Sequence, residues 1–260
     1  MISLKSKNEI SLMAESAKRL KAVFRELKKN VRAGVTTGEI DEKAEELIRN
    51  QKTKPAFKGY RGYPACACIS PNDVVVHGIP SKNCRLDVGD IVSVDMGLIY
   101  EGYYSDAART WSLGNVTSEA QNLIQVARKA FYVGMAEMQI GNRIGDMSHA
   151  IQSYVESCGF SVVRDFVGHG IGRALHEDPQ VPNFGTPGRG PKLEVGMVLA
   201  IEPMVVAGKH EVDILKDSWT VVTRDRKLAA HYEDTVAFTE KGPVNLTGPQ
   251  EYSDFEAPED

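Results

Sequence analysis

Leu86-Asp-Val-Gly-Asp-Ile-Val-Ser-Val-Asp95 recurs 107 residues later as Leu193-Glu-Val-Gly-Met-Val-Leu-Ala-Ile-Glu202. Each copy begins with Leu, an acidic residue and Val-Gly, continues as a run rich in apolar and β-branched residues, and ends in a carboxylate. Such a run is typical of a buried strand. We therefore expect equivalent strands in two related halves, with Asp95 and Glu202 facing a common centre.

Two further matches favour an internal duplication. Gly34-x-x-x-Gly38 recurs at the same offset as Gly141-x-x-x-Gly145. His77-Gly-Ile79 recurs as His169-Gly-Ile171 after 92 residues, so the second half needs about 15 extra residues, and the Gly- and Pro-rich segment 173–192 can supply them. We expect one domain over residues 1–248, with halves near 1–112 and 113–248, followed by an acidic tail at 249–260.

The pattern of elements indicates an α+β fold. Ser6 with Glu9, and Thr36 with Glu39, are capping boxes that begin two helices, and helical periodicity also covers residues 117–138 and 144–157. The expected strands, bounded by Gly, Pro and Asn turns, are residues 67–70, 74–76, 91–96, 162–167, 197–201, 220–223 and 234–238.

Composition excludes several classes of protein. No apolar run approaches the roughly 20 residues of a membrane span, and the N-terminus lacks a secretory signal, so we expect a cytoplasmic protein. A net charge of -4 argues against nucleic acid as the main partner. The four cysteines fit no disulfide framework, and most of them are expected in the core. Basic residues of the first helix favour a solvated face over a docking patch for a ribosome.

Asp95 and Glu202 each end a strand that is expected to be buried. A lone buried carboxylate is costly, so each must be protonated, paired or bound to a metal ion. Pairing with arginine is the simpler alternative, but few Arg or Lys residues lie in the surrounding apolar runs. The pattern therefore favours a metal site.

Asp106 follows Asp95 across an expected hairpin that turns near residues 100–102. If the turn centres between Tyr100 and Glu101, the two aspartates lie directly opposite, with Cβ atoms about 5 Å apart. A cation between them would remove their repulsion. The alternative is an exposed polar pair at the open end of the hairpin.

Two more candidates are weaker when each is taken alone. His169 is flanked by glycines that allow close approach to the imidazole, but a hydrogen-bonded turn histidine explains it equally well. Glu233 enters an apolar run and could be a surface residue. As a set, four carboxylates and one imidazole suit Mn, Fe, Co or Zn, and four negative charges need more than one dication. The sequence thus predicts a hydrolase with two metal ions about 3.5–4 Å apart.

Six motifs follow one another along nearly the whole chain: His77-Gly-Ile-Pro80, Val94-Asp-Met-Gly-Leu98, Tyr104-Ser-Asp-Ala107, Gly168-His-Gly-Ile-Gly172, Ile201-Glu-Pro203 and His231-Tyr-Glu-Asp-Thr235. Together they resemble the short, bacterial-like type I methionine aminopeptidases. The resemblance implies a pita-bread (creatinase/aminopeptidase) fold, in which two pseudo-twofold-related halves form a curved antiparallel sheet covered by helices.

The resemblance also implies a ligand set and a reaction. Asp95 would bind one divalent ion, His169 and Glu202 the other, and Asp106 and Glu233 would bridge the two. The reaction would remove the initiator methionine from nascent polypeptides with a small second residue, by attack of a metal-activated hydroxide on the peptide carbonyl, and Glu202 would handle the proton.

Further roles follow from the same resemblance. His77 and His176 match its non-ligand histidines, and would hydrogen-bond to the peptide nitrogen and to the carbonyl or oxyanion oxygen, respectively. The methionine pocket would also include Tyr60, Tyr63, Cys68 and Trp219. By sequence alone these would be turn histidines and core residues. Phe57 and Leu175 depart from the commonest pattern, which has a cysteine and an aromatic residue there, and this leaves the second-residue preference open.

Two other functions compete with this interpretation. Xaa-Pro aminopeptidases and prolidases share the fold and ligands but carry a separate domain before it. A non-catalytic peptide-binding module normally lacks some ligands, whereas all five are present here. We expect a monomer that acts on nascent N-termini, with transient ribosome contact as an open question.

Overall fold

The computed structural model describes residues 1–248, and the predicted acidic tail at 249–260 lies outside the described residues. Each α-helix in the described part agrees with a helix that the sequence predicts. In both predicted capping boxes, the hydroxyl of Ser6 or Thr36 accepts a backbone N–H, and Glu9 or Glu39 accepts one in return. The helices are α1 (Lys7–Lys28), α2 (Thr37–Asn50), α3 (Ser118–Ala136), α4 (Ile144–Ser157) and the short 3-10 helix η1 (Tyr60–Gly62).

Antiparallel strands form the rest of the fold. The main sheet runs in the order β1-β4-β5-β14-β9-β7-β8, with β2 paired to β4 and β15 to β14, and two small sheets run β13-β10-β6 and β11-β12-β3. The strands are β1 (Lys54–Pro55), β2 (Cys68–Pro71), β3 (Val74–Val76), β4 (Ile91–Tyr100), β5 (Tyr103–Ser112), β6 (Ser161–Val162), β7 (Gly168–Gly170), β8 (Glu177–Val181), β9 (Val198–Ile201), β10 (Met204–Val206), β11 (Val212–Ile214), β12 (Val221–Thr223), β13 (Ala229–His231), β14 (Glu233–Thr239) and β15 (Gly242–Asn245).

One predicted strand is wrong over most of its length. The sequence predicts a strand at residues 162–167, but β6 ends at Val162 and the next strand begins at Gly168. Arg164 and Asp165 are exposed in the intervening loop, because two charged side chains interrupt the apolar run. The other predicted strands are present, with shifts of a few residues at their ends.

The 107-residue offset recurs in the structure. Helices α2 and α4 begin 107 residues apart and have 14 residues each. The isolated bridges Thr36↔Arg85 and Arg143↔Lys192 are offset by the same interval. These correspondences support the predicted duplication, while the boundary between the halves stays a prediction.

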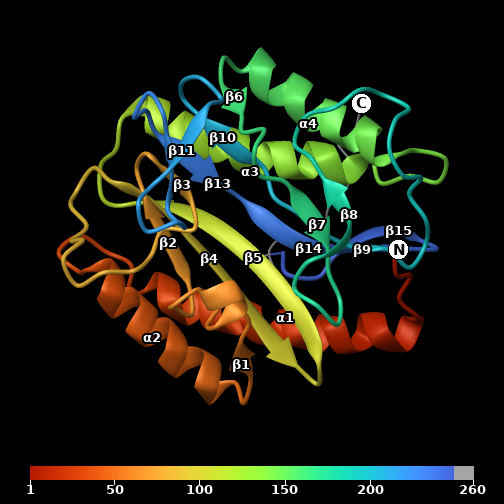
Figure 1. Ribbon diagram of the computed structural model, residues 1–260, viewed down its shortest axis with the longest axis horizontal. Helices are drawn as coiled ribbons and strands as arrows, with labels where there is room; N and C mark the ends of the chain where they lie inside the picture. Colours follow the sequence, from red (N-terminus) through yellow and green to blue (C-terminus); the bar gives the residue numbers. More distant parts are fainter. Residues whose placement is uncertain (249–260) are drawn as a thin grey trace.

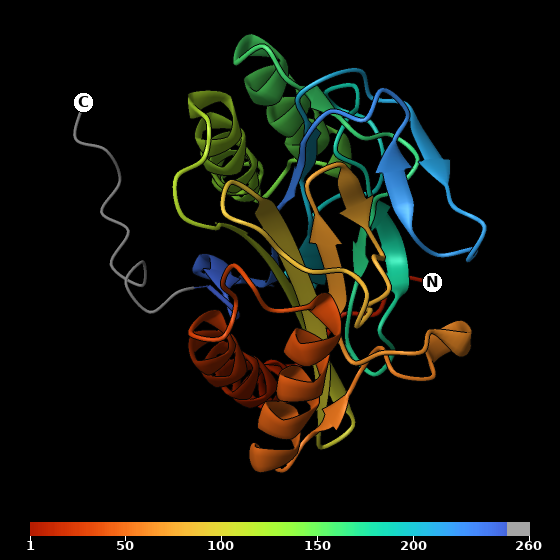
Figure 2. The same ribbon diagram turned by 90° about the vertical axis from the view of Figure 1, so that its left-hand side faces the viewer.

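Helices cover one face of the main sheet. Figure 1 shows α1 and α2 along one side of the long β4–β5 hairpin and α3 and α4 along the other. In Figure 2, β11 and β12 project on the side away from α1 and α3. Strand β4 packs Val92, Val94 and Met96 against α1 and α2, and β9 and β14 supply Leu199, Ile201, Val236 and Phe238 to the cluster with α3 and α4.

The alternation of side chains along a strand places the candidate residues on the other face. Asp95 lies between Val94 and Met96, and Glu202 follows Ile201. Both therefore point away from the helices. In the described residues, no helix is long and apolar enough to cross a membrane.

Candidate metal centre

The β4–β5 hairpin sets the spacing of the first two carboxylates. Tyr100 pairs with Tyr103, so the turn is at Glu101-Gly102, both with positive φ (50° and 78°). Asp95 consequently lies opposite Ala108, and Asp106 opposite Gly97. The directly opposed register considered from the sequence is therefore wrong. The aspartates are diagonal neighbours on one face, which still leaves them within reach of a common cation.

Strands β4, β5 and β14 are neighbours in the sheet, and Ala108 of β5 pairs with a residue on each side. Asp95 on β4 and Glu233 on β14 both pair with this residue of β5. Ala108 is fully buried, and its methyl group is small enough to leave room between the two acidic side chains. Thr235 fixes the neighbouring aspartate, since its Oγ1 accepts the Asp106 N–H at 3.0 Å and donates to the Asp106 carbonyl at 2.9 Å.

Glycines hold His169 between two strands. A Cβ at Gly168 would collide with the carbonyl oxygen of Ala200, and one at Gly170 with that of Asp178. The Gly170 carbonyl accepts a hydrogen bond from His169 Nδ1 at 2.9 Å. A carbonyl can only accept, so Nδ1 carries the proton and Nε2 presents its lone pair. Nε2 lies 3.6 Å from Oε1 of Glu202.

The candidate ligand atoms form two overlapping groups. Single ligand atoms of Asp106, His169 and Glu233 lie within 4.8 Å of one another, and so do those of Glu202, His231 and Glu233. Asp95 Oδ1, Asp106 Oδ1 and Glu233 Oε1 are buried without a hydrogen-bond partner. Buried polar atoms are normally satisfied. The donor set therefore fits divalent cations, which would supply the missing partners.

Burial and like charge dominate the electrostatics of this group. Burial, with the neighbouring carboxylates, raises the pKa of Asp95, Glu202 and Glu233 well above the usual range. Burial raises the pKa of Asp106 to about 7 and lowers that of His169 to about 4. The raised pKa values of the carboxyl groups are those expected for acidic side chains that are buried close together with little positive charge nearby.

The partly buried Arg109 does not pair with the candidate ligand side chains. Its Nη2 donates to Oδ1 of Asp234 at 2.6 Å, and its Nη1 donates to the carbonyl oxygen of Glu233 at 2.6 Å. Arg109 therefore supports the backbone of β14 from the helix side of the sheet. Pairing with arginine, which was the alternative for Asp95 and Glu202, occurs instead at Asp234. The sequence pattern did not indicate Asp234 as a candidate.

The predicted histidines and pocket residues border this group. The rings of His169 and His176 have centroids 4.2 Å apart, and His176 Nδ1 lies 2.8 Å from the hydroxyl of Tyr60. Cys68 on β2 lies opposite Asp95. The Trp219 ring contacts the rings of Tyr63 and His77 edge-on, with centroid distances of 5.0 Å and 6.1 Å, respectively.

The structure thus gathers all the predicted site residues into one region. Tyr63, Cys68, Phe57 and Leu175 belong to one apolar cluster, with Tyr60 and Trp219 packed against it. Burial lowers the pKa of His77 to about 4 and that of His176 to about 3, so both rings are neutral at pH 7. Neutral imidazoles can donate one hydrogen bond and accept another.

His77 has a strained backbone. Its φ is 57°, which is uncommon for a residue with a side chain. A Cβ at the following Gly78 would collide with the carbonyl oxygen of Ile69. The close approach of these two segments fixes the imidazole beside Phe166, at a centroid distance of 5.4 Å. Such strain is common where a side chain is held for function.

His231 belongs to the site but was not among the predicted ligands. It is 2% exposed, and its Nε2 lies 3.7 Å from Glu202 Oε2 and 3.9 Å from Glu233 Oε2. A signal was present, because residues two apart in an extended chain point to the same side, and His231 precedes Glu233 by two.

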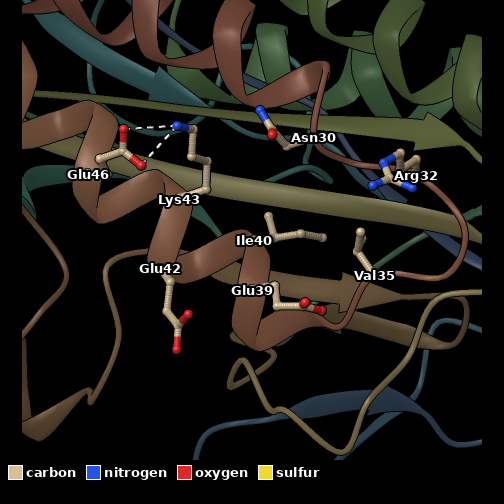
Figure 3. Close-up of a pocket in the computed structure, with 8 residues that line it drawn as sticks. All are labelled: Asn30, Arg32, Val35, Glu39, Ile40, Glu42, Lys43 and Glu46. Atoms are coloured by element: carbon tan, nitrogen blue, oxygen red, sulfur yellow. Dashed lines mark hydrogen bonds and ion pairs between the residues drawn. The ribbon is translucent and has the colours of Figure 1, made fainter.

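Two surface pockets in the described residues lie away from this group. One of about 350 Å³ lies between the end of α1 and the start of α2, where Lys43 pairs with Glu46 at 2.8 Å (Figure 3). Its lining residues are Asn30, Arg32, Val35, Glu39, Ile40, Glu42, Lys43 and Glu46. None of them is a predicted site residue.

Comparisons with known proteins agree with this geometry. Methionine aminopeptidase of Clostridium perfringens is 55% identical over 247 residues, which are 95% of this chain and 99% of that protein. Methionine aminopeptidase 1 of Bacillus subtilis is 47% identical with the same coverage. The crystal structure of methionine aminopeptidase from Thermotoga maritima has a TM-score of 0.94 at 45% identity, covering 96% of this chain and all of that one.

More distant structures show the fold alone. Prolidase from Pyrococcus furiosus has a TM-score of 0.77 at 22% identity, over 95% of this chain and 66% of that one. These neighbours confirm the α+β pita-bread fold. The profile of metallopeptidase family M24 matches residues 11–240. With that match and the near-complete coverage of its relatives, the chain belongs to metallopeptidase family M24, among the methionine aminopeptidases.

Proposed function

We propose that this protein removes the initiator methionine from nascent polypeptides and prefers a small second residue. Membership of a metallopeptidase family means that divalent metal binding is expected of the chain. The observation that carries the proposal is the group of buried, unpartnered carboxylate oxygens beside a cluster of apolar side chains. This combination would put bound cations next to apolar side chains that suit a methionine side chain.

Five side chains would hold two ions. Asp95 would bind one ion, His169 and Glu202 the other, and Asp106 and Glu233 would bridge them. When bound, the ions would polarise the peptide carbonyl and lower the pKa of a bound water to near neutrality. Oxygen-rich ligands with one imidazole accept Mn, Fe, Co or Zn, and cellular supply decides among them.

The protein's own groups would orient the peptide and move the proton. Glu202 would take a proton from the attacking water and pass it to the departing amine. His176, beside His169, would donate to the carbonyl oxygen as negative charge develops there. His77 would hydrogen-bond to the nitrogen of the scissile peptide.

The apolar side of the site would select methionine. Tyr63, Cys68 and Trp219 present aromatic and sulfur surfaces that suit a thioether. Phe57 and Leu175 are both buried in the same cluster. Leu175 lacks an aromatic face, and this substitution bears on the width of the second-residue site.

The reaction can be tested on two peptides. Metal-free protein should release no methionine from Met-Ala-Ser, and addition of Mn or Co ions should restore release. An Ala-Pro peptide should stay intact. Cleavage of Ala-Pro instead would favour a prolidase-like activity, and the absence of cleavage with either peptide would favour a peptide-binding module.

The metal assignment makes a prediction for Asp106→Asn. The substitution removes one negative charge from a bridging position, so it should abolish binding of the second ion. Because loss of residues that only support metal ligands already costs about 10–100-fold, turnover should fall at least about a hundredfold. The far-ultraviolet circular dichroism spectrum should be unchanged. Full activity in this variant would contradict the assignment.

The place of action stays a prediction. We expect a cytoplasmic monomer whose substrates are the N-termini of nascent chains, with transient contact to the ribosome as an open question. Gel filtration would test the monomeric state, and cosedimentation with ribosomes would test the contact to the ribosome.

A further inference from the structure

We propose that His231 is a sixth metal-ligating residue, and that its Nε2 binds the cation shared by Glu202 and Glu233. The inference rests on the proposed metal-dependent function. It adds a second imidazole to a centre for which the sequence predicted only one.

The backbone of His231 is rigidly placed. The residue ends β13 opposite Met204 of β10. Oγ1 of Thr110 accepts the His231 N–H at 3.0 Å and donates to its carbonyl oxygen at 2.8 Å. Thr110 is in turn bonded to Ser93 at 2.7 Å. Hydrogen bonds through Thr110 of β5 and Ser93 of β4 thus tie the backbone of His231 to the strands that carry the predicted ligands Asp106 and Asp95.

Glu202 lies between two imidazoles. Its Oε1 is 3.6 Å from Nε2 of His169, and its Oε2 is 3.7 Å from Nε2 of His231. His169 is the predicted partner of Glu202 on one ion. The nearly equal spacing on the other side of the same carboxylate gives His231 an equivalent position.

The distances suit ligation better than hydrogen bonding. Separations of 3.7 Å and 3.9 Å to the two carboxylates exceed the 2.7–3.2 Å of a good N–H···O bond. With metal–ligand bonds of about 2.1 Å, these separations correspond to angles of roughly 120–135° at a shared ion. All three ligand atoms lie within 4.8 Å of one another.

The alternative is a histidine that serves only the core. A buried core histidine normally has both ring nitrogens satisfied or faces apolar groups. Nε2 of His231 is buried without a hydrogen-bond partner and faces two carboxylates. A cation among the three groups would satisfy all of them at once.

A second imidazole has a consequence for metal choice. Imidazole nitrogen suits Zn, Fe and other borderline ions, whereas an oxygen-only set suits Mg and Mn. We therefore expect this centre to prefer Co or Zn over Mn more strongly than a centre with one histidine.

Proton NMR of the cobalt-loaded protein tests the proposal. Ring N–H protons of imidazoles bound to paramagnetic Co(II) are shifted far outside the normal range, and protein labelled with ¹⁵N in histidine identifies them. Wild type should show two shifted imidazoles. His231→Gln should show one, with Co(II) affinity reduced about tenfold or more. His149→Gln, which changes an exposed histidine of α4, should keep both signals and the affinity.

The outcomes separate this proposal from the function on which it rests. Glutamine keeps an N–H donor, so unchanged Co(II) affinity and spectrum in His231→Gln would overturn ligation. A single shifted imidazole in wild type would overturn it as well, and would do so even if the variant failed to fold. A wild-type protein that bound no Co(II) at all would instead contradict the proposed metal-dependent function.

Discussion

Tyr60 and His176 form a pair in which one residue can set the chemistry of the other. The Tyr60 hydroxyl lies 2.8 Å from His176 Nδ1, and burial holds the pKa of His176 near 3. A neutral imidazole has one N–H. If the hydroxyl donates to Nδ1, the imidazole proton is on Nε2, where it can donate to a substrate oxygen. Tyr60 would then act through His176 as a positioning residue.

Tyr60→Phe tests this coupling because it keeps the ring and removes the hydroxyl. Loss of one hydrogen bond, worth about 1 kcal/mol, should lower kcat roughly five- to tenfold. The KM for a methionyl peptide should change little, since the apolar pocket is intact. The same substitution in a His176→Ala background should have no further effect. An equal loss in both backgrounds would show that Tyr60 acts independently of His176.

At the scale of an element, the N-terminus of α1 is tied to the hairpin that carries Asp106. Glu9 accepts the Ser6 N–H at 2.9 Å, and the Tyr103 hydroxyl donates to its Oε1 at 2.8 Å. These hydrogen bonds lower the pKa of Glu9 from 4.5 to about 2, and the bond from the Ser6 backbone makes the largest contribution. The helix cap is therefore linked to β5 through a carboxylate.

This cap predicts a dependence of stability on pH. A carboxylate whose pKa is depressed by folding stabilises the native state above its unfolded pKa, and that contribution disappears as pH falls through the folded value. The contribution of Glu9 should decline between about pH 4.5 and pH 2. Urea unfolding of wild type and Glu9→Gln should therefore show a difference in the free energy of unfolding that shrinks over this interval.

Glu15→Gln is a matched control for this change. Glu15 lies on the same helix and pairs with Lys18 at 3.5 Å on the surface. Its substitution should produce a small difference. A Glu9→Gln difference that stayed constant from pH 5 to pH 2 would refute the role of the cap carboxylate.

At the scale of the whole molecule, the candidate centre joins the two predicted halves. Asp95 and Asp106 come from the first, and His169, Glu202 and Glu233 come from the second. Cations that bind only the assembled site add their binding free energy to the stability of the whole fold. Metal content should therefore govern thermal stability as well as activity.

Calorimetry can measure this linkage. Free metal at a hundred times its dissociation constant should stabilise the native state by about 2.7 kcal/mol, which raises Tm by roughly 5–10 °C in a chain of this size. The chelated protein should melt at the lower temperature, and Asp106→Asn should lose most of the increase. A metal-independent Tm in wild type would argue against a site that spans both halves.

The sequence could indicate which residues are candidates for the site, but it could not give their exact placement. The buried strands that lead to Asp95 and Glu202 could be recognised because apolar runs and carboxylates are local features, although β4 continues past Asp95 to Tyr100. The hairpin register could not, because it depends on Glu101 adopting a positive φ. That choice moves the partner of Asp95 from residue 106 to Ala108.

Tertiary contacts explain the other differences. The spacing of two residues between His231 and Glu233 is a local signal, but the contact of β13 with β5 through Thr110, which fixes the position of His231, is tertiary and shows in no local pattern. The strand predicted at residues 162–167 fails for a local reason, because the exposed charged pair Arg164 and Asp165 interrupts the apolar run.

Ala108 gives the sheet a further property. It stands between Asp95 and Glu233 on successive strands, and strands in a sheet are about 4.8 Å apart. The main-chain hydrogen bonds of the sheet therefore hold Asp95 and Glu233 two strand spacings apart. The small methyl group of Ala108 leaves space between their side chains. Ala108, which ligates no ion, would thus limit how many ions can bind. A larger side chain at this position would reduce the space between the ligands without changing any of them.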